Sequence, residues 1–117
     1  MIICLNGEIF IKSIERAQGI PGYSGDIELM LYDEGIVIVN ELNVEDYLKK
    51  VVPSEMPTGY GVEALKVQAV CARNYAYRQI ENNKYSMYGA HVDDSTSFQV
   101  YNNTNENAAS NQAIAET

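Results

Sequence analysis

The sequence predicts an α+β domain in which short β-hairpins pack on a long central helix, with a helical C-terminal end. Two observations indicate this class. The N-terminal third carries short β-branched or alternating segments, whereas residues 62–82 repeat small and apolar residues at helical spacing. Residues 102–117 form a polar turn that runs into a further helical segment. A chain of 117 residues suits one hydrophobic core, so we expect a single domain over residues 1–117.

Two hairpins are expected before the first helix. Residues 2–5 and 9–11 flank Asn6-Gly7, a dipeptide suited to a tight turn, and this arrangement predicts the first hairpin. Residues 25–32 alternate between polar and apolar side chains, and residues 36–39 form a β-branched run. The turn-forming residues between them predict a second hairpin.

The first helix is expected to begin after Asn43 and to run to about Val52. Asn43 suits the N-cap position, with Asp46 at the third helical position. Pro53 is expected to end the helix, because proline lacks a backbone N–H and clashes with the preceding turn.

Glu55 lies between Pro53 and Pro57, which makes it the most informative acidic residue of the chain. Proline disfavours the α conformation for the residue before it, so we expect residues 54–56 to form a stiff turn that aims the carboxylate. The apolar neighbours are Val51, Val52 and Met56. Partial burial among them would raise the pKa of Glu55 towards values suited to proton transfer near neutral pH. The alternative, which composition alone favours, is a loop glutamate that caps the following helix.

The second helix is expected from Val62 to about Asn82. Its stripe of mostly small residues consists of Leu65, Ala69, Ala72, Ala76 and Ile80. Small side chains let a neighbouring backbone approach closely, which suits an enclosed, central helix. Lys66 and Arg73 project from one face, about 10 Å apart at 1.5 Å per residue. That face is either a solvated basic surface or a binding surface.

The net charge restricts the class of partner, and the small number of cysteine and histidine residues restricts the possible metal sites. The net charge of −8 argues against nucleic acid, which is bound by clustered basic residues, and favours a neutral or cationic partner. Cys4 and Cys71 lack metal-site spacing and are expected to be buried, reduced thiols, although a disulfide between them stays open. His91 is the only histidine, and a lone histidine is more often a hydrogen-bonded loop residue than a ligand. We therefore expect no metal and no other cofactor.

Three motifs follow one another along the chain. They are Glu45-Asp46-Tyr47-Leu48 with Glu55-Met56-Pro57 after a valine-rich link, EALKVQAVCARNYA at residues 63–76, and Gln99-Val100-Tyr101 after an Asp-rich turn. This series, over roughly residues 22–103, resembles the stage II sporulation protein D / LytB family. The resemblance implies a SpoIID-like domain and a lytic transglycosylase of bacterial cell walls. Such enzymes cut peptidoglycan glycan strands between N-acetylmuramic acid and N-acetylglucosamine and leave a 1,6-anhydro end.

The resemblance also implies roles for individual residues. Glu55, the glutamate of the family's EMP motif, is implied as the catalytic residue, and Lys66 and Arg73 as substrate-binding residues. Weaker substrate-binding candidates, for which a structural role is equally open, are Gln68, Gln99 and Tyr101. One carboxyl group suffices, because the sugar's own 6-hydroxyl replaces the water that other glycosidases activate with a second carboxylate. Glu55 would protonate the glycosidic oxygen and then accept the proton of that hydroxyl. We expect Glu55 to lie at the cleft where the hairpin layer meets the long helix.

Further expectations concern context. Some relatives hold zinc before the QVY motif, but Val92 and Phe98 stand in that neighbourhood here, so no zinc is expected. The family pattern continues with strands and a Ser/Gly-rich segment, so we expect a domain truncated at its C-terminus and a parent protein located outside the cytoplasm, at the wall or membrane. The expected partners are peptidoglycan glycan strands and other wall hydrolases or amidases. The alternative function is a non-catalytic, wall-binding amidase enhancer of the LytB type.

Overall fold

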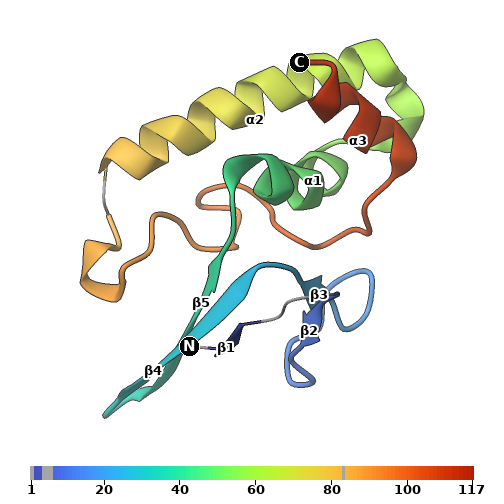
Figure 1. Cartoon of the computed structure of the whole chain (residues 1–117). Helices are drawn as coiled ribbons and strands as arrows, with labels where there is room; N and C mark the ends of the chain where they lie inside the picture. Colours follow the sequence, from blue (N-terminus) through green and yellow to red (C-terminus); the bar gives the residue numbers. More distant parts are fainter. Residues whose placement is uncertain (1, 4–6, 83) are drawn as a thin grey trace.

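The computed structural model describes residues 2–3, 7–82 and 84–117, which form two small antiparallel sheets and three α-helices (Figure 1). The strands are β1 (Ile2–Ile3), β2 (Ile9–Phe10), β3 (Gly22–Tyr23), β4 (Asp26–Tyr32) and β5 (Gly35–Glu41). The α-helices are α1 (Val44–Glu55), α2 (Val62–Asn82) and α3 (Ala108–Ala115), with short 3-10 helices η1 (Thr58–Tyr60) and η2 (Ser86–Tyr88). The α+β class is confirmed.

The hairpin of β4 and β5 is confirmed. Its strands pair in register from Asp26 with Glu41 to Tyr32 with Gly35, which leaves the two residues 33–34 as the turn. β1 adds to the other side of β4, so the strand order of this sheet is β1-β4-β5. The closed end of the hairpin points away from the three α-helices (Figure 1).

The first predicted hairpin is wrong. β1 pairs with β4, through Ile2 and Ile27, and β2 pairs with β3, through Ile9 and Tyr23. A turn dipeptide favours a local reversal but does not decide which strand edge its flanks join. An isolated two-stranded hairpin is marginal in water, whereas β1 gains the ready-made edge of β4. Part of that expectation, residues 4–6, lies outside the described residues.

The start of α1 is confirmed, but its predicted end is wrong. Asn43 caps the helix by accepting a hydrogen bond from the backbone N–H of Asp46 at 2.9 Å. Pro53 lies inside the last turn, and the helix continues to Glu55. There the proline removes one hydrogen bond close to the helix end, while its ring is buried in the interior. Only Met56, the residue before Pro57, is extended as predicted, with φ −136° and ψ 129°.

The central position of α2 is confirmed by the burial of its stripe. Leu65, Ala69, Ala72 and Ala76 are buried, and both α1 and α3 pack against α2. α3 is the predicted helical C-terminal end. None of the helices in the described part is long and apolar enough to cross a membrane.

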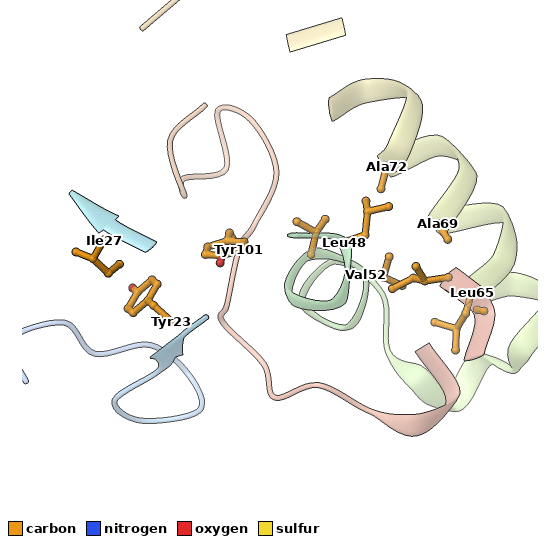
Figure 2. Close-up of a cluster of buried hydrophobic side chains, with 11 residues drawn as sticks. Tyr23, Ile27, Leu48, Val52, Leu65, Ala69, Ala72 and Tyr101 are labelled. Carbon is orange, nitrogen blue, oxygen red and sulfur yellow. The ribbon is translucent and has the colours of Figure 1, made fainter. Parts of the chain in front are cut away.

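The hydrophobic core is one continuous cluster that extends from the helices to the sheets (Figure 2). Leu65, Ala69 and Ala72 of α2 meet Leu48 and Val52 of α1. On the far side of α1 the core continues through Tyr101 to Tyr23 and Ile27. The hairpins therefore do not pack directly on α2 as predicted. The alanine stripe of α2 packs against helices instead. α1 and the segment that carries Tyr101 lie between α2 and the sheets.

Candidate functional site

Glu55 is the last residue of α1, and its side chain is exposed. Its Oε1 atom accepts a hydrogen bond from the backbone N–H of Val100 at 2.5 Å. The expected partial burial is wrong, because α1 continues through Pro53 and the apolar Val51 and Val52 turn into the core. The carboxylate is nevertheless fixed in position. The hydrogen bond from Val100 of the QVY motif fixes it, and not a turn imposed by the two prolines.

The segment after Val100 is fastened to the same end of α1. The Ser54 hydroxyl accepts hydrogen bonds from the backbone N–H groups of Asn103 at 3.0 Å and Thr104 at 3.1 Å. The carbonyl oxygen of Lys50 accepts one from the backbone N–H of Asn102 at 3.0 Å. Residues 100–104 therefore follow the last turn of α1 and fix the surroundings of Glu55.

Asn102 turns this segment. It is buried and has a φ of 59°, a left-handed conformation that asparagine tolerates better than most residues. Its Nδ2 atom donates to the carbonyl oxygen of Gly22 at 2.8 Å, and its own carbonyl oxygen accepts from Nε2 of Gln18 at 2.6 Å. Asn102 thus ties the site loop to the N-terminal part of the chain.

Gln99 lies in the interior, between α1 and α2. Its Nε2 atom donates to the carbonyl oxygen of Ala72 at 3.2 Å, and its Oε1 atom accepts from the hydroxyl of Tyr47 at 3.0 Å. The side chain has 6% exposure. In this structure Gln99 joins two helices and offers little surface to a ligand.

Tyr101 is also interior. Its ring stacks on Tyr47, with the centroids 5.3 Å apart, and its hydroxyl donates to Oδ1 of Asn40 at 2.7 Å. Burial raises the pKa of both tyrosines far above the usual value, and the negative charges of Glu55 and Asp93 add to the shift at Tyr47. Both phenols therefore stay protonated and serve as hydrogen-bond donors.

Arg73 faces the start of α1 and the end of α3. Its Nε and Nη2 atoms donate to the two carboxylate oxygens of Glu45 at 2.9 and 3.0 Å, and Nη2 also donates to the carbonyl oxygen of Ile114 at 3.2 Å. Glu45 and Glu55 are ten residues apart on α1, about 15 Å at 1.5 Å per residue. Arg73 is therefore not brought together with Glu55.

Lys66 also faces acidic groups. Its Nζ atom lies 3.1 Å from Oε1 of Glu63 and 3.8 Å from Oε1 of Glu116. Within the part of the chain that the structure describes, neither Lys66 nor Arg73 pairs with Glu55. Gln68, the remaining candidate on α2, is half-buried.

A cavity of about 790 Å³ opens between the hairpin and the C-terminal half of α2. Its wall includes residues 37–42, Ala76 and Ile80 of α2, and the loop 88–94. We expected Glu55 to lie at this junction, but Glu55 does not line the cavity. The continuation of α1 through Pro53 carries it to the other end of the helix.

Asp93, on the wall of this cavity, is an acidic group that the sequence analysis did not select. Its carboxylate accepts hydrogen bonds from the Tyr85 hydroxyl at 2.8 Å and from the backbone N–H of Ser95 at 2.8 Å. Burial acts to raise the pKa of Asp93, but hydrogen bonds from Ser95 and Tyr85 outweigh it, and the pKa lies below the usual value. The Asp-x-Ser pattern of a local turn was the available signal.

The groups considered for metal binding are dispersed. Cys71 is exposed, so its predicted burial is wrong, because it lies beside the buried stripe of α2 and not on it. Cys4 lies outside the described residues, and His91 is exposed. Among residues 2–3, 7–82 and 84–117, no three His, Cys, Asp or Glu side chains gather in a group that could hold a metal ion.

Comparison with known proteins gives partial matches to longer proteins. The chain is 42% identical over 96 residues to an uncharacterised protein of Brachyspira hyodysenteriae, a match that covers 81% of this chain and 26% of that protein. It is 42% identical over 70 residues to the amidase enhancer of Bacillus subtilis, covering 60% of this chain and 9% of the relative. It is 36% identical over 77 residues to stage II sporulation protein D of Bacillus subtilis, covering 64% and 22%.

The chain thus spans about a quarter or less of the length of these relatives. No solved structure matches it. The sequence model of the SpoIID family, described as stage II sporulation protein, matches residues 32–117, which is most of the chain and includes Glu55 and the QVY motif. This chain therefore belongs to the SpoIID, or stage II sporulation protein, family.

Proposed function

We propose that this protein cleaves the glycan strands of bacterial cell-wall peptidoglycan as a lytic transglycosylase, with Glu55 as the proton-transfer group. The observation that carries the proposal is the Glu55 carboxylate, exposed at the end of α1 and held through Oε1 by the backbone N–H of Val100. This contact unites the two family motifs that contain Glu55 and Val100. The Bacillus subtilis relatives are named stage II sporulation protein D and amidase enhancer, and these names favour a role in sporulation or beside an amidase. We propose that this role is carried out on the wall, outside the cytoplasm.

The proposed reaction uses one carboxyl group twice. Glu55, in its acid form, gives its proton to the glycosidic oxygen as the bond from that oxygen to the anomeric carbon breaks. The carboxylate then takes the proton of the 6-hydroxyl of the same muramic acid, whose oxygen bonds to the anomeric carbon. A 1,6-anhydro end forms, and no water is consumed. Because Oε1 is engaged by Val100, Oε2 is the oxygen we assign to the sugar.

The substrate-binding roles of the other candidates stay predictions. We rank these candidates by their burial and by the polar groups that they contact. Lys66 and Gln68 are half-buried on α2, and the two carboxylates beside Lys66, those of Glu63 and Glu116, belong to exposed side chains. Arg73 has a carboxylate, a carbonyl and a hydroxyl as partners, and Gln99 and Tyr101 are buried. We therefore favour Lys66 and Gln68 for ligand contacts and assign positioning roles to the other three.

The test is product analysis with peptide-free glycan strands. We expect the full-length gene product to release fragments with 1,6-anhydro-muramyl ends, detected by mass spectrometry. Glu55→Gln should lose about 100-fold or more of the rate, the contribution typical of a general acid. Glu81→Gln, an exposed glutamate near the end of α2, is the matched control and should keep the rate. Absence of anhydro products, or an unchanged rate in Glu55→Gln, would refute the proposal.

A second candidate function is a non-catalytic amidase enhancer that binds the wall. Two observations favour it: a relative carries that name, and the cavity of about 790 Å³ does not include Glu55. Purified sacculi distinguish the two functions. If the wild-type protein cuts no glycan, while both it and Glu55→Gln bind sacculi and stimulate an amidase equally, the enhancer function is supported.

A further inference from the structure

β5 has an open edge. The strand order β1-β4-β5 places β5 at the border of its sheet, and in the described part of the chain only β4 pairs with it. An edge strand presents a row of unpaired backbone N–H and C=O groups to which another extended segment can pair. β5 offers such an edge over Gly35–Glu41.

The cavity described above lies along this edge. Its wall contains the uninterrupted run of residues 37–42. Because successive side chains of a strand point to opposite faces, an unbroken run indicates that the edge of β5 meets the cavity, which also extends to Tyr23 of β3 and Ile27 of β4. Residues 88–94 form another part of the wall. They belong to the connection that follows α2 (Figure 1). The cavity is therefore a groove between a strand edge and a loop.

The hydrogen-bonding groups of β5 are directed into this groove at alternate positions. In an antiparallel pair, residues that exchange hydrogen bonds with their partner alternate with residues that do not. Counted from the Tyr32–Gly35 pair that closes the two-residue turn, the second group contains Ile36, Ile38 and Asn40. Their backbone N–H and C=O groups turn away from β4, and Ile38 and Asn40 line the groove.

An apolar surface continues beside the edge. Leu29 lies opposite Ile38, and Leu31 lies opposite Ile36, so all four side chains share one face of the hairpin. Their exposed fractions are 48% and 40% for the first pair and 84% and 63% for the second. An added strand with apolar side chains at alternate positions would cover this face on one side of its backbone.

Charge decides the kind of segment. The chain carries a net charge of −8, and the groove wall contains the acidic residues Glu41, Asp93 and Asp94. Arg16 is also part of the wall and pairs with Asp94, which leaves Glu41 and Asp93 in excess. A second copy would bring the same charge and be repelled, whereas a neutral or basic segment is attracted. We propose that the groove between β5 and residues 88–94 binds an extended segment of another protein, which is apolar at alternate positions, neutral or basic at the others, and adds to β5 as a strand. This inference goes beyond the proposed function, which concerns glycan at Glu55.

The test uses defined peptides and the full-length gene product. The probe is a fluorescein-labelled peptide of about eight alternating valine and lysine residues, long enough to follow β5 at 3.3 Å per residue. Its control is the same peptide with N-methyl groups on alternate backbone nitrogens, which keeps the charge but removes pairing. In fluorescence anisotropy we expect the methylated peptide to bind at least about tenfold more weakly, since several backbone hydrogen bonds are lost. Equal binding of the two peptides would overturn the proposal. No binding of the first would overturn it as well, and is the result expected if a strand of the same protein outside residues 1–117 already pairs with β5.

Two proline variants localise the contact. Ile38→Pro removes an N–H that faces the groove, whereas Leu31→Pro removes one on the outer edge of β4, away from it. Proline is tolerated at edge positions whose N–H is unpaired, so both variants should fold, as circular dichroism can verify. We expect Ile38→Pro to weaken peptide binding by about tenfold or more and Leu31→Pro to leave it within about twofold. The reverse order would place the peptide elsewhere; if Ile38→Pro does not fold, the methylated peptide still decides.

Discussion

Glu55 and Val100 are 45 positions apart, yet the carboxylate of the first accepts the backbone N–H of the second at 2.5 Å. One of the two belongs to the end of a helix, the other to an irregular loop. The contact means that the EMP and QVY motifs are two parts of one structural unit. Glu55 therefore has two properties, its acidity and its ability to accept this hydrogen bond. Different substitutions remove one or both of them.

Glu55→Gln and Glu55→Ala should therefore differ in stability. Glutamine keeps an oxygen that accepts the Val100 N–H, whereas alanine does not. We expect Glu55→Ala to lower the free energy of unfolding by about 1 kcal/mol more than Glu55→Gln, the usual net value of one hydrogen bond. Urea denaturation followed by circular dichroism measures this difference. Equal stability of the two variants would show that the contact does not hold the loop.

Arg73 should prove to be a positioning residue. Its guanidinium pairs with both oxygens of Glu45 and with the end of α3, and lysine cannot reproduce this fork. We expect both Arg73→Lys and Arg73→Ala to reduce the free energy of unfolding by about 1–2 kcal/mol. Arg78→Ala, an exposed arginine on the same helix, is the control and should change little.

Glycan binding provides the second measurement on these variants. At a temperature where every protein is folded, Arg73→Ala should bind peptide-free glycan as the wild type does. A stable Arg73→Ala that loses glycan binding would instead support the substrate-binding role implied by the family resemblance.

The Arg73–Glu45 pair should also make stability depend on pH. Hydrogen bonds from Arg73 are the main reason that the pKa of Glu45 lies below its ordinary value of 4.5. Because the folded pKa is below the unfolded one, the stabilisation is fully present above about pH 4.5 and is lost as the pH falls through the folded pKa. The difference in free energy of unfolding between wild type and Glu45→Gln should thus shrink from neutral pH to about pH 3. Glu81→Gln should show no such trend; a difference that grows on acidification would contradict the assignment.

The buried amide of Gln99 should couple to Tyr47. Gln99→Leu leaves the Tyr47 hydroxyl buried without its acceptor, which we expect to cost about 1–3 kcal/mol of unfolding free energy. Tyr47→Phe removes that hydroxyl, so the double variant should be less destabilised than the sum of the two single variants. A double-mutant cycle by urea denaturation measures the coupling, and strictly additive effects would argue against the pair.

Local patterns predicted the elements that local physics decides. The cap at Asn43, the alanine stripe of α2 and the turn between β4 and β5 each depend on residues close in sequence, and all three are confirmed. The end of α1 was predicted wrongly because the cost of Pro53 is opposed by burial, which the sequence does not display. The partners of β1 and β2 depend likewise on which distant edges are available.

The site was predictable as a set of motifs but not as a geometry. The resemblance selected Glu55, Arg73 and Gln99 together, and the structure separates an exposed carboxylate from an ion-paired arginine and a buried amide. These differences arise from contacts such as that of Gln99 with Ala72, 27 positions away. Residue types in a motif do not distinguish a group that meets a ligand from one that supports it.

The left-handed turn at Asn102 has a consequence for the order of folding. The contacts of Asn102 with Gln18 and Gly22 span 84 and 80 positions, so each contact closes a large loop of the chain. Closing a loop costs more conformational entropy as the loop becomes longer, so we expect these contacts to form late. During refolding, helical circular dichroism should therefore develop before the tyrosine fluorescence change that reports the stacking of Tyr47 on Tyr101. An incompletely folded molecule would already possess its helices while the surroundings of the acid group were still unformed. We therefore expect the surface around Glu55 to form last.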